Sequence, residues 1–219
     1  MDADRFEDWE QLDELAHAAY EAGDLVSAEE YLLRATALPD VVATVWGNLG
    51  LVRMAREDYV GAIAAYANSV GEIPMDRANR GLAYERLGNA RAARSDYRAL
   101  LERVPDDVDT LVNLGTLELA RGHRNRAKKY LERAAELDPT ANWPLSDVYA
   151  ERGALDCAAL ALRTAVDAGE MRALLDLARV EKSRGNVSAS RVAYQRAIES
   201  RVDGAADEYA IFQLETGQN

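Results

Sequence analysis

One short phrase returns along this chain at nearly constant spacing. The tripeptide "NLG" occupies residues 48–50 and 113–115, and a near copy, "NRG", occupies residues 79–81. The steps between these copies are 31 and 34 residues. A fixed period of this length is typical of arrays of small supersecondary units, because one such unit cannot bury its apolar face alone. The chain is therefore constrained to a stack of units, each packed on the next in the same way.

Each copy lies inside a longer pattern of a first helix, a break, a second helix and a closing proline. The second, third and fourth repeats carry it through Trp46, Leu49, Gly50, Ala62, Tyr66 and Pro74; Gly81, Tyr84, Gly88, Ala93, Tyr97 and Pro105; and Leu111, Leu114, Gly115, Gly122, Ala127, Leu131 and Pro139. Within each predicted helix, apolar residues recur at spacings of three and four residues, which predicts amphipathic helices. A mid-helix glycine costs about 1 kcal/mol relative to alanine. We therefore expect Gly50, Gly81 and Gly115 to lie where a larger side chain would hold two helices apart.

The pattern resembles the tetratricopeptide repeat (TPR), a 34-residue helix–turn–helix unit with the signature W-x2-L-G-x2-Y, A-x3-F and P. The resemblance implies an all-α fold, a right-handed α-solenoid of about six TPR-like helix pairs. Repeats are predicted to start near residues 9, 43, 74, 108, 139 and 171, within a single domain over 1–219. A capping helix at about 204–215 is expected to cover the last repeat with the apolar residues Tyr209, Ile211, Phe212 and Leu214.

Several positions depart from the regular pattern or refine it. The first helix of a pair is expected to end at a C-cap glycine, for which Glu57 substitutes in the second repeat. In the fifth repeat Pro144 stands near the start and the Leu–Gly pair is missing, so a short first helix is predicted. The single cysteine, Cys157, cannot form an internal disulfide. It lies in the apolar run "CAALAL", and we expect a small buried hydrophobe.

Composition and charge exclude some classes of function. The net charge is −12, which argues against a general nucleic-acid binder. Residues 1–40 hold 12 acidic and two basic residues, whereas residues 76–133 hold 13 basic and nine acidic ones. No apolar run approaches the roughly 20 residues of a membrane span, and the acidic N-terminus shows no leader. We therefore expect no membrane insertion and a cytoplasmic location.

No catalytic or cofactor-binding pattern is recognisable. His17 and His123 lie in different repeats, and neither belongs to a metal-binding spacing such as H-E-x-x-H. The sequence lacks G-x-S-x-G, a phosphate-cradling glycine loop and a Cys–His pair. We predict that the protein is not an enzyme and binds no metal or cofactor.

The resemblance implies that the first helix of each pair lines a concave groove. The predicted groove residues are Asn48, Leu51, Met54, Asn79, Leu82, Arg86, Val112, Asn113, Thr116, Leu119 and Trp143. Side-chain amides both donate and accept, so three asparagines in a row could bind a peptide backbone of any sequence, beside an apolar lining for its side chains. One end of the groove is predicted to be acidic and the other to be mixed but more basic. The predicted partner is a protein of unknown identity, bound through a peptide or helical segment by an adaptor or chaperone-like module. Two alternatives stay open: the asparagines are common in this family, and the protein's own tail could fill the groove.

The stretch "RGHRNRAKKY" at 121–130 contains five basic residues and no acid: Arg121, Arg124, Arg126, Lys128 and Lys129. It is either a solvated helix face or a docking patch for an acidic partner. Nucleic acid is not expected, because aromatic residues do not alternate with the basic ones. Contact between this stretch and the acidic N-terminus of a second copy would make a self-assembling head-to-tail scaffold, a possible homo-oligomer. A third reading is an accessory subunit that binds through its outer surface.

Overall fold

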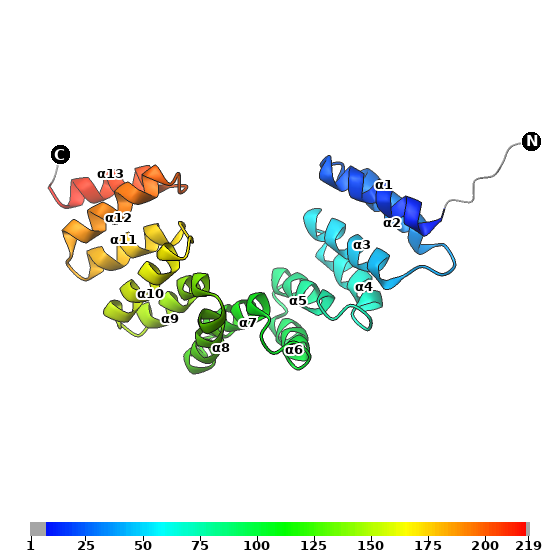
Figure 1. Cartoon of the computed structure of the whole chain (residues 1–219), viewed down its shortest axis with the longest axis horizontal. Coiled ribbons are helices and arrows are strands. Elements are labelled where there is room, and N and C mark those ends of the chain that lie inside the picture. The colour runs from blue at the N-terminus through cyan, green and yellow to red at the C-terminus, as the bar shows by residue number, and fades with distance from the viewer. Residues whose placement is uncertain (1–7, 218–219) are drawn as a thin grey trace, which may run out of the picture. The chain divides into compact units, whose positions relative to one another are not determined.

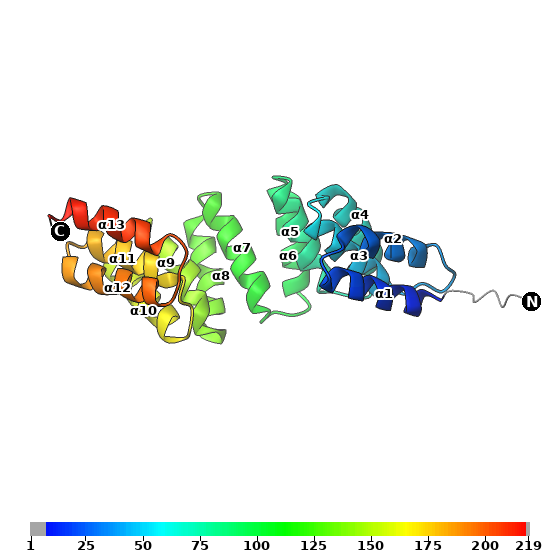
Figure 2. The same cartoon turned by 90° about the horizontal axis from the view of Figure 1, so that it is seen from above.

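The computed structural model describes residues 8–217, and all regular structure within that range is helical (Figures 1 and 2). Helix packing divides the chain into two compact units, an N-terminal unit of residues 1–105 and a C-terminal unit of residues 106–219. Within each unit, successive helices form pairs, and each pair packs on the next. The predicted fold class, an all-α helical-repeat solenoid, is confirmed. A single domain over 1–219 stays a prediction.

The N-terminal unit contains three helix pairs. Their helices are α1 (Trp9–Glu21) and α2 (Leu25–Thr36), α3 (Ala43–Ala55) and α4 (Tyr59–Ser69), and α5 (Asp76–Arg86) and α6 (Ala90–Leu101). The first helices α1, α3 and α5 contact one another in sequence, so they share one face of the unit. Each second helix begins after an Asp or Asn, at 24, 58 and 89, whose side chain accepts the backbone N–H three residues on.

The C-terminal unit contains three further pairs and a last helix. Its elements are α7 (Val108–Ala120), α8 (Arg124–Leu137), the 3₁₀ turn η1 (Pro139–Ala141), α9 (Asn142–Ala150), α10 (Leu155–Asp167), α11 (Ala173–Ser183), α12 (Val187–Glu199) and α13 (Ala205–Glu215). Helix α9 spans only 9 residues, as Pro144 predicts, and η1 precedes it.

The mid-helix glycines lie against the large side chains of the paired helix. A Cβ on Gly50 would come within 2.4 Å of the Tyr66 ring, and one on Gly81 within 2.5 Å of the Tyr97 ring. At Gly115 the same atom would lie 2.6 Å from Leu131. The group nearest each glycine is thus the aromatic or leucine that stands four residues after Ala62, Ala93 or Ala127 on the facing helix. Tyr66, Tyr97 and Leu131 are fully buried, which leaves them no room to move aside.

The helix-ending positions behave as the pattern indicates. Gly88 has a φ of 74°, in the left-handed region that favours glycine. Glu57 adopts the same conformation, with a φ of 62°. The second repeat therefore ends its first helix in the same geometry with a residue that bears a Cβ, which is unfavourable there.

Two expectations about buried residues are wrong. Cys157 is exposed, because on α10 the buried face consists of Ala158, Ala159, Leu162 and their neighbours. Helix α13 does pack on α12, yet of the four apolar residues expected to cover the last repeat only Phe212 is fully buried, and Tyr209 is partly buried. Ile211 and Leu214 are 56% and 72% exposed, since a helix that covers a neighbour on one side turns every third or fourth residue outward.

Candidate functional site

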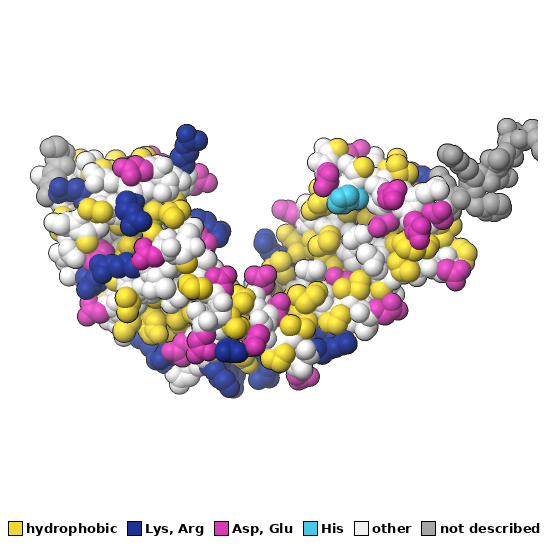
Figure 3. All heavy atoms as spheres, in the orientation of Figure 1, with side chains coloured by type: hydrophobic (Ala, Val, Ile, Leu, Met, Phe, Trp, Pro, Cys, Tyr) yellow, Lys and Arg dark blue, Asp and Glu magenta, His cyan; other side chains and the backbone are white. Residues whose placement is uncertain are grey.

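The N-terminal unit has an open cavity on the face shared by its first helices. It measures about 280 Å³. The residues that line it, which define the N-terminal cavity, are Asp13, Ala16, His17, Tyr20, Leu32, Asn48, Leu51 and Val52. Two of the predicted groove residues, Asn48 and Leu51, thus lie together here. Figure 3 shows hydrophobic side chains gathered over α3 and α5 and acidic ones over α1.

The amide of Asn48 is held by a neighbouring repeat. Its Nδ2 donates to Asp13 Oδ1 at 2.8 Å, which joins α3 to α1. One N–H and the Oδ1 atom of the amide remain to meet a ligand. Leu51, which is 44% exposed, presents apolar surface beside it. The cavity therefore offers a polar group of fixed orientation next to an apolar wall.

A buried carboxylate holds Asn79. Asp76, only 6% exposed, accepts from Asn79 Nδ2 at 3.3 Å through Oδ1. A Cβ on Gly47 would lie 2.7 Å from Asp76 Oδ2, so the glycine leaves the space that this carboxylate occupies. Burial, together with the charge of Asp76, raises the pKa of Tyr66. Asn79 does not line the N-terminal cavity.

The other predicted groove residues of this unit are more dispersed. Met54 packs against the core formed around Tyr66 and is partly buried. Leu82 is half-buried, and Arg86 is exposed at the end of α5. None of these three lines the N-terminal cavity.

The C-terminal unit has a larger cavity, of about 510 Å³. The residues that line it, which define the C-terminal cavity, are Val108, Asp109, Val112, Asn113, Thr116, Asp138, Thr140, Ala141, Trp143, Pro144, Asp147, Glu170, Arg172 and Asp176. Four predicted groove residues, Val112, Asn113, Thr116 and Trp143, come together in it. Leu119, a fifth, instead packs on the core around Leu131 and Leu145.

Trp143 is fixed on two sides within this cavity. Its Nε1 donates to Asp176 Oδ2 at 2.8 Å, and the guanidinium of Arg172 lies 4.6 Å from its ring centroid, a cation–π distance. Arg172 is also bonded to Glu170 at 2.7 and 2.8 Å. The Thr116 hydroxyl donates to carbonyls of its own helix, so its donor is already used.

The predicted basic end of the groove is neutralised by ion pairs. Arg172 pairs with Glu170, Arg179 with Asp176 and Glu208, and Lys182 with Glu215. Figure 3 accordingly shows basic and acidic side chains next to one another over α11 to α13. This end is thus mixed in charge, as predicted, but the expected excess of positive charge is compensated. The acids that pair with these cations come from the α10–α11 turn, from α11 itself and from α13.

The basic stretch at 121–130 is partly paired. Arg124 lies 2.7 Å from Glu151, Lys128 lies 3.3 Å from Glu132, and Arg126 lies 3.9 Å from Glu118. Arg121 and Lys129 are exposed, and within residues 8–217 neither has an acidic oxygen within 4.0 Å. The acidic N-terminus, the other half of the proposed head-to-tail contact, begins with residues 1–7, which lie outside the described residues.

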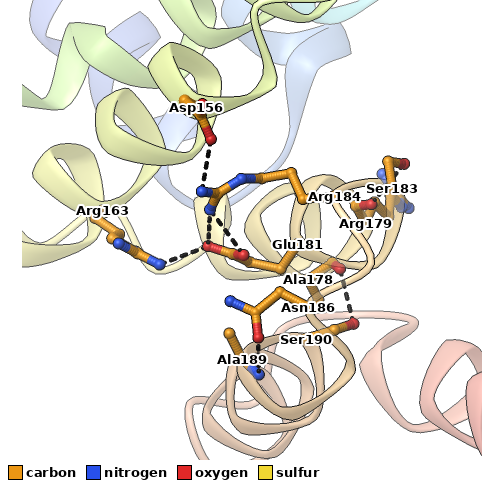
Figure 4. A network of polar contacts seen from close by, with 10 residues as sticks. All are labelled: Asp156, Arg163, Ala178, Arg179, Glu181, Ser183, Arg184, Asn186, Ala189 and Ser190. Carbon is orange, nitrogen blue, oxygen red and sulfur yellow. Dashed lines mark hydrogen bonds and ion pairs between the residues drawn. The ribbon is translucent and has the colours of Figure 1, made fainter.

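Buried or partly buried charges that sequence reasoning missed occupy the tyrosine position of the repeat signature. Arg53 bonds Glu29 at 2.9 Å, and Glu118 lies 2.6 Å from His123 Nδ1. Glu181, 1% exposed, accepts from Arg163 at 2.5 Å and from Arg184 at 2.9 Å (Figure 4). The signal was available, because a charged residue stands three residues after the Leu–Gly pair in two repeats.

Further features bear on function. Within the part of the chain that the structure describes, no group of three or more His, Cys, Asp or Glu residues could hold a metal ion. None of the described helices is long and apolar enough to cross a bilayer.

Several solved structures share this fold. A tetratricopeptide repeat protein from Parabacteroides merdae is 17% identical, with a TM-score of 0.63, over 94% of this chain and 98% of that one. PilF from Pseudomonas aeruginosa is 18% identical, with a TM-score of 0.74, over 94% and 97%. A chain of the APC/C hetero-tetramer Cut9–Hcn1 is 15% identical, with a TM-score of 0.74, over 95% of this chain and 43% of that one. At these identities the likeness concerns the fold alone. No curated protein matches the sequence significantly.

A family model matches most of the repeat array. The tetratricopeptide repeat model aligns with residues 14–74, 79–122 and 112–173, which together exceed half of the chain. These ranges include the glycine–tyrosine pairs and, apart from Asp13 and Asp176, the residues that line both cavities. The chain therefore belongs to the tetratricopeptide repeat family.

Proposed function

We propose that this protein is a non-enzymatic interaction module that binds a peptide or helical segment of another protein on the face formed by its first helices. The observation that supports this best is that six of the 11 predicted groove residues line two open cavities, one in each unit. Both cavities combine apolar walls with a few polar groups of fixed orientation, the usual composition of a recognition site. Proteins of this family generally mediate protein–protein contact.

An affinity capture from lysate of the source organism tests this proposal. The wild-type chain is compared with the triple variant Asn48→Ala, Asn79→Ala, Asn113→Ala and with the single variant Leu51→Gln. A matched control replaces asparagines elsewhere, Asn68→Ala and Asn125→Ala, both exposed. We expect a protein that the wild type and the control retain and that the groove variants lose.

A loss of the bound protein supports groove binding only if the groove variants remain folded. Asn48→Ala removes the bond to Asp13, so the melting temperature of each variant is measured by circular dichroism. A partner that every folded variant retains would contradict groove binding. The binding site would then be sought on the outer surface, through which an accessory subunit would bind. The next candidate there is the basic patch of Arg121, Arg124, Arg126, Lys128 and Lys129.

Self-assembly is the second candidate function. Exposed Arg121 and Lys129, without an acidic oxygen nearby in the described residues, favour it. Head-to-tail contact through charge predicts a molecular mass that rises at low salt and falls to the monomer at about 0.5 M salt. Light scattering across protein concentrations measures this, and a monomeric mass at low salt would rule the scaffold out. The adaptor or chaperone-like role and the cytoplasmic location stay predictions.

A further inference from the structure

The C-terminal cavity has an apolar wall and an uncompensated negative charge. Val112, Trp143 and Pro144 supply the apolar part. Five carboxylates and a single guanidinium line the same space. A groove of this composition has an electrostatic preference as well as an apolar one.

The charges of this cavity are not all equivalent. Glu170 is satisfied by Arg172, Asp176 by Trp143 and Arg179, and Asp138 by the backbone and hydroxyl of Thr140. Asp109 and Asp147 remain, and within the described residues neither makes a side-chain hydrogen bond or an ion pair. Two carboxylates on the lining are thus available to a cation from outside.

Asp147 lies in an environment that a bound cation would relieve. Loss of hydration at its carboxylate, followed by the negative charges of Asp176 and Glu151, raises the pKa of Asp147 above its ordinary value. A nearby positive charge would oppose these effects. The same side chain is exposed overall, so a ligand can reach it.

The cavity already accommodates one guanidinium. Arg172 stacks on Trp143 and bonds Glu170 with two nitrogens, which is how a planar cation from a partner would be bound there. Arg172 therefore covers one face of the Trp143 indole and bonds the Glu170 carboxylate, and in its absence a partner's cation could contact both groups.

We propose that the C-terminal cavity binds a basic amphipathic segment of another protein, whose apolar residues contact Val112 and Trp143 and whose Lys or Arg side chains contact Asp109 and Asp147. This inference rests on the proposed function, because it names the chemistry of the segment that the groove takes. It distinguishes the partner from an acidic segment and from a second copy docking through its acidic N-terminus.

Fluorescence anisotropy with labelled synthetic peptides tests the inference on the full chain. One short peptide alternates leucine with lysine, a second has glutamate in place of lysine, and a third has glutamine. We expect the lysine peptide to bind more tightly than the glutamine peptide, and the glutamate peptide least, at low salt. The preference should shrink at about 0.5 M salt, where exposed charges are screened.

Variants locate the binding in the cavity. The double variant Asp109→Asn, Asp147→Asn should lower the affinity for the lysine peptide about three- to tenfold and leave the affinity for the glutamine peptide unchanged. The control replaces two exposed acids of the same unit, Glu199→Gln and Asp203→Asn, and should leave both affinities within about twofold. Arg172→Ala should raise the affinity for the lysine peptide about two- to threefold, because Glu170 and one face of Trp143 become available to a lysine of the peptide.

The outcomes separate the inference from the proposed function. Equal or tighter binding of the glutamate peptide, or no loss in the Asp109/Asp147 double variant, would overturn the basic-segment inference. If Val112→Gln then still weakens all three peptides, groove binding stands without the charge preference. If Val112→Gln changes no affinity and the protein captured from lysate is also indifferent to groove variants, the proposed function fails as well.

Discussion

The helix pairs of the N-terminal and C-terminal units pack in the same register, but some of the residues where the two helices of a pair meet differ between the units. In the N-terminal unit Gly50 and Gly81 accept the rings of Tyr66 and Tyr97 at distances that no Cβ would allow. In the C-terminal unit the corresponding residues of the last two repeats are Ser146 and Ala178, both buried beneath their neighbours. The fourth repeat, which opens the C-terminal unit, keeps the glycine, because a Cβ on Gly115 would lie 2.6 Å from Leu131. The two units therefore differ at this position only through the last two repeats.

Charged side chains join neighbouring repeats in both units, and in the N-terminal unit Arg53 of α3 bonds Glu29 of α2 at 2.9 Å. In the C-terminal unit ion pairs connect successive helix pairs, with Glu181 buried between Arg163 of α10 and Arg184 at the end of α11, whose guanidinium also lies 2.6 Å from Asp156 (Figure 4). Tyr194 packs against Tyr209 and Phe212 of α13, with ring centroids 5.9 and 5.3 Å away. The comparison shows that one repeat register tolerates close aromatic–glycine packing in one place and a buried charge in another.

The largest effect is expected where the backbone is closest. Gly50→Ala should lower the free energy of unfolding by about 2–3 kcal/mol, because overpacking against a buried ring exceeds the helix-propensity gain of about 1 kcal/mol. Denaturant unfolding measures the change. Gly71→Ala is the control, since a Cβ there meets nothing within 4 Å. Adding Tyr66→Leu, which recreates the Ala16–Leu32 combination of the first repeat, should recover part of the loss. An additive double variant would contradict the contact as the cause.

The next effect concerns the buried charge of the C-terminal unit. Glu181→Ala should cost about 1–2 kcal/mol, less than a fully buried pair, because both arginines can turn toward water. The control is Lys182→Ala, which breaks the exposed pair with Glu215 and should cost less than about 0.5 kcal/mol. Equal losses in the two variants would show that burial of Glu181 adds nothing.

Both variants also test the single-domain prediction. If residues 1–219 unfold as one cooperative domain, Gly50→Ala and Glu181→Ala shift the same calorimetric transition. Two transitions, each moved by only one of the variants, would mean that the N-terminal and C-terminal units unfold independently.

The helix-ending positions provide a pair of opposite substitutions. Gly88→Ala should destabilise by about 1 kcal/mol, because an alanine is strained at a positive φ. Glu57→Gly should stabilise by about 0.5 kcal/mol, because it removes the same strain at a cost in chain entropy. Thermal unfolding checks both, and a loss in Glu57→Gly would show that its side chain contributes more than its backbone costs.

The smallest effect is a dependence on pH in the N-terminal unit. Burial raises the pKa of Glu85, which accepts a hydrogen bond from Tyr97 at 2.9 Å. Because the folded protein binds this proton more tightly than the unfolded chain does, Glu85 does not destabilise the fold below the ordinary pKa, where it is protonated in both states. The free energy of unfolding falls as pH rises through the raised pKa of the folded state. Glu85→Gln should therefore stabilise the protein at pH 7 by less than about 1 kcal/mol and have no effect below about pH 4. A gain of equal size at both pH values would contradict burial as the cause.

Prediction from the sequence succeeded where a local signal repeats. The glycines and the alanines four residues before the large side chain recur in register, so each occurrence supports the others. Pro144 of the fifth repeat is a departure with a known local effect, and it correctly predicted the short helix α9. It failed for Cys157, Ile211 and Leu214, because a continuous apolar run does not reveal which helix face turns inward. It did not reveal that the cations at one end of the groove are paired, because two of the acids that pair with Arg179 and Lys182 lie about 30 residues away in α13.

The sequence by itself determined the helical-repeat fold, the family and the residues that alternate between core and surface, because helix periodicity and the stacking register are properties of nearby residues. Only the tertiary structure decided which side chains meet across repeats. Asn48 reaches Asp13 and Trp143 reaches Asp176, pairs separated by 35 and 33 residues. Such contacts arise when one repeat stacks on the next, and they set both the shape and the charge of the two cavities.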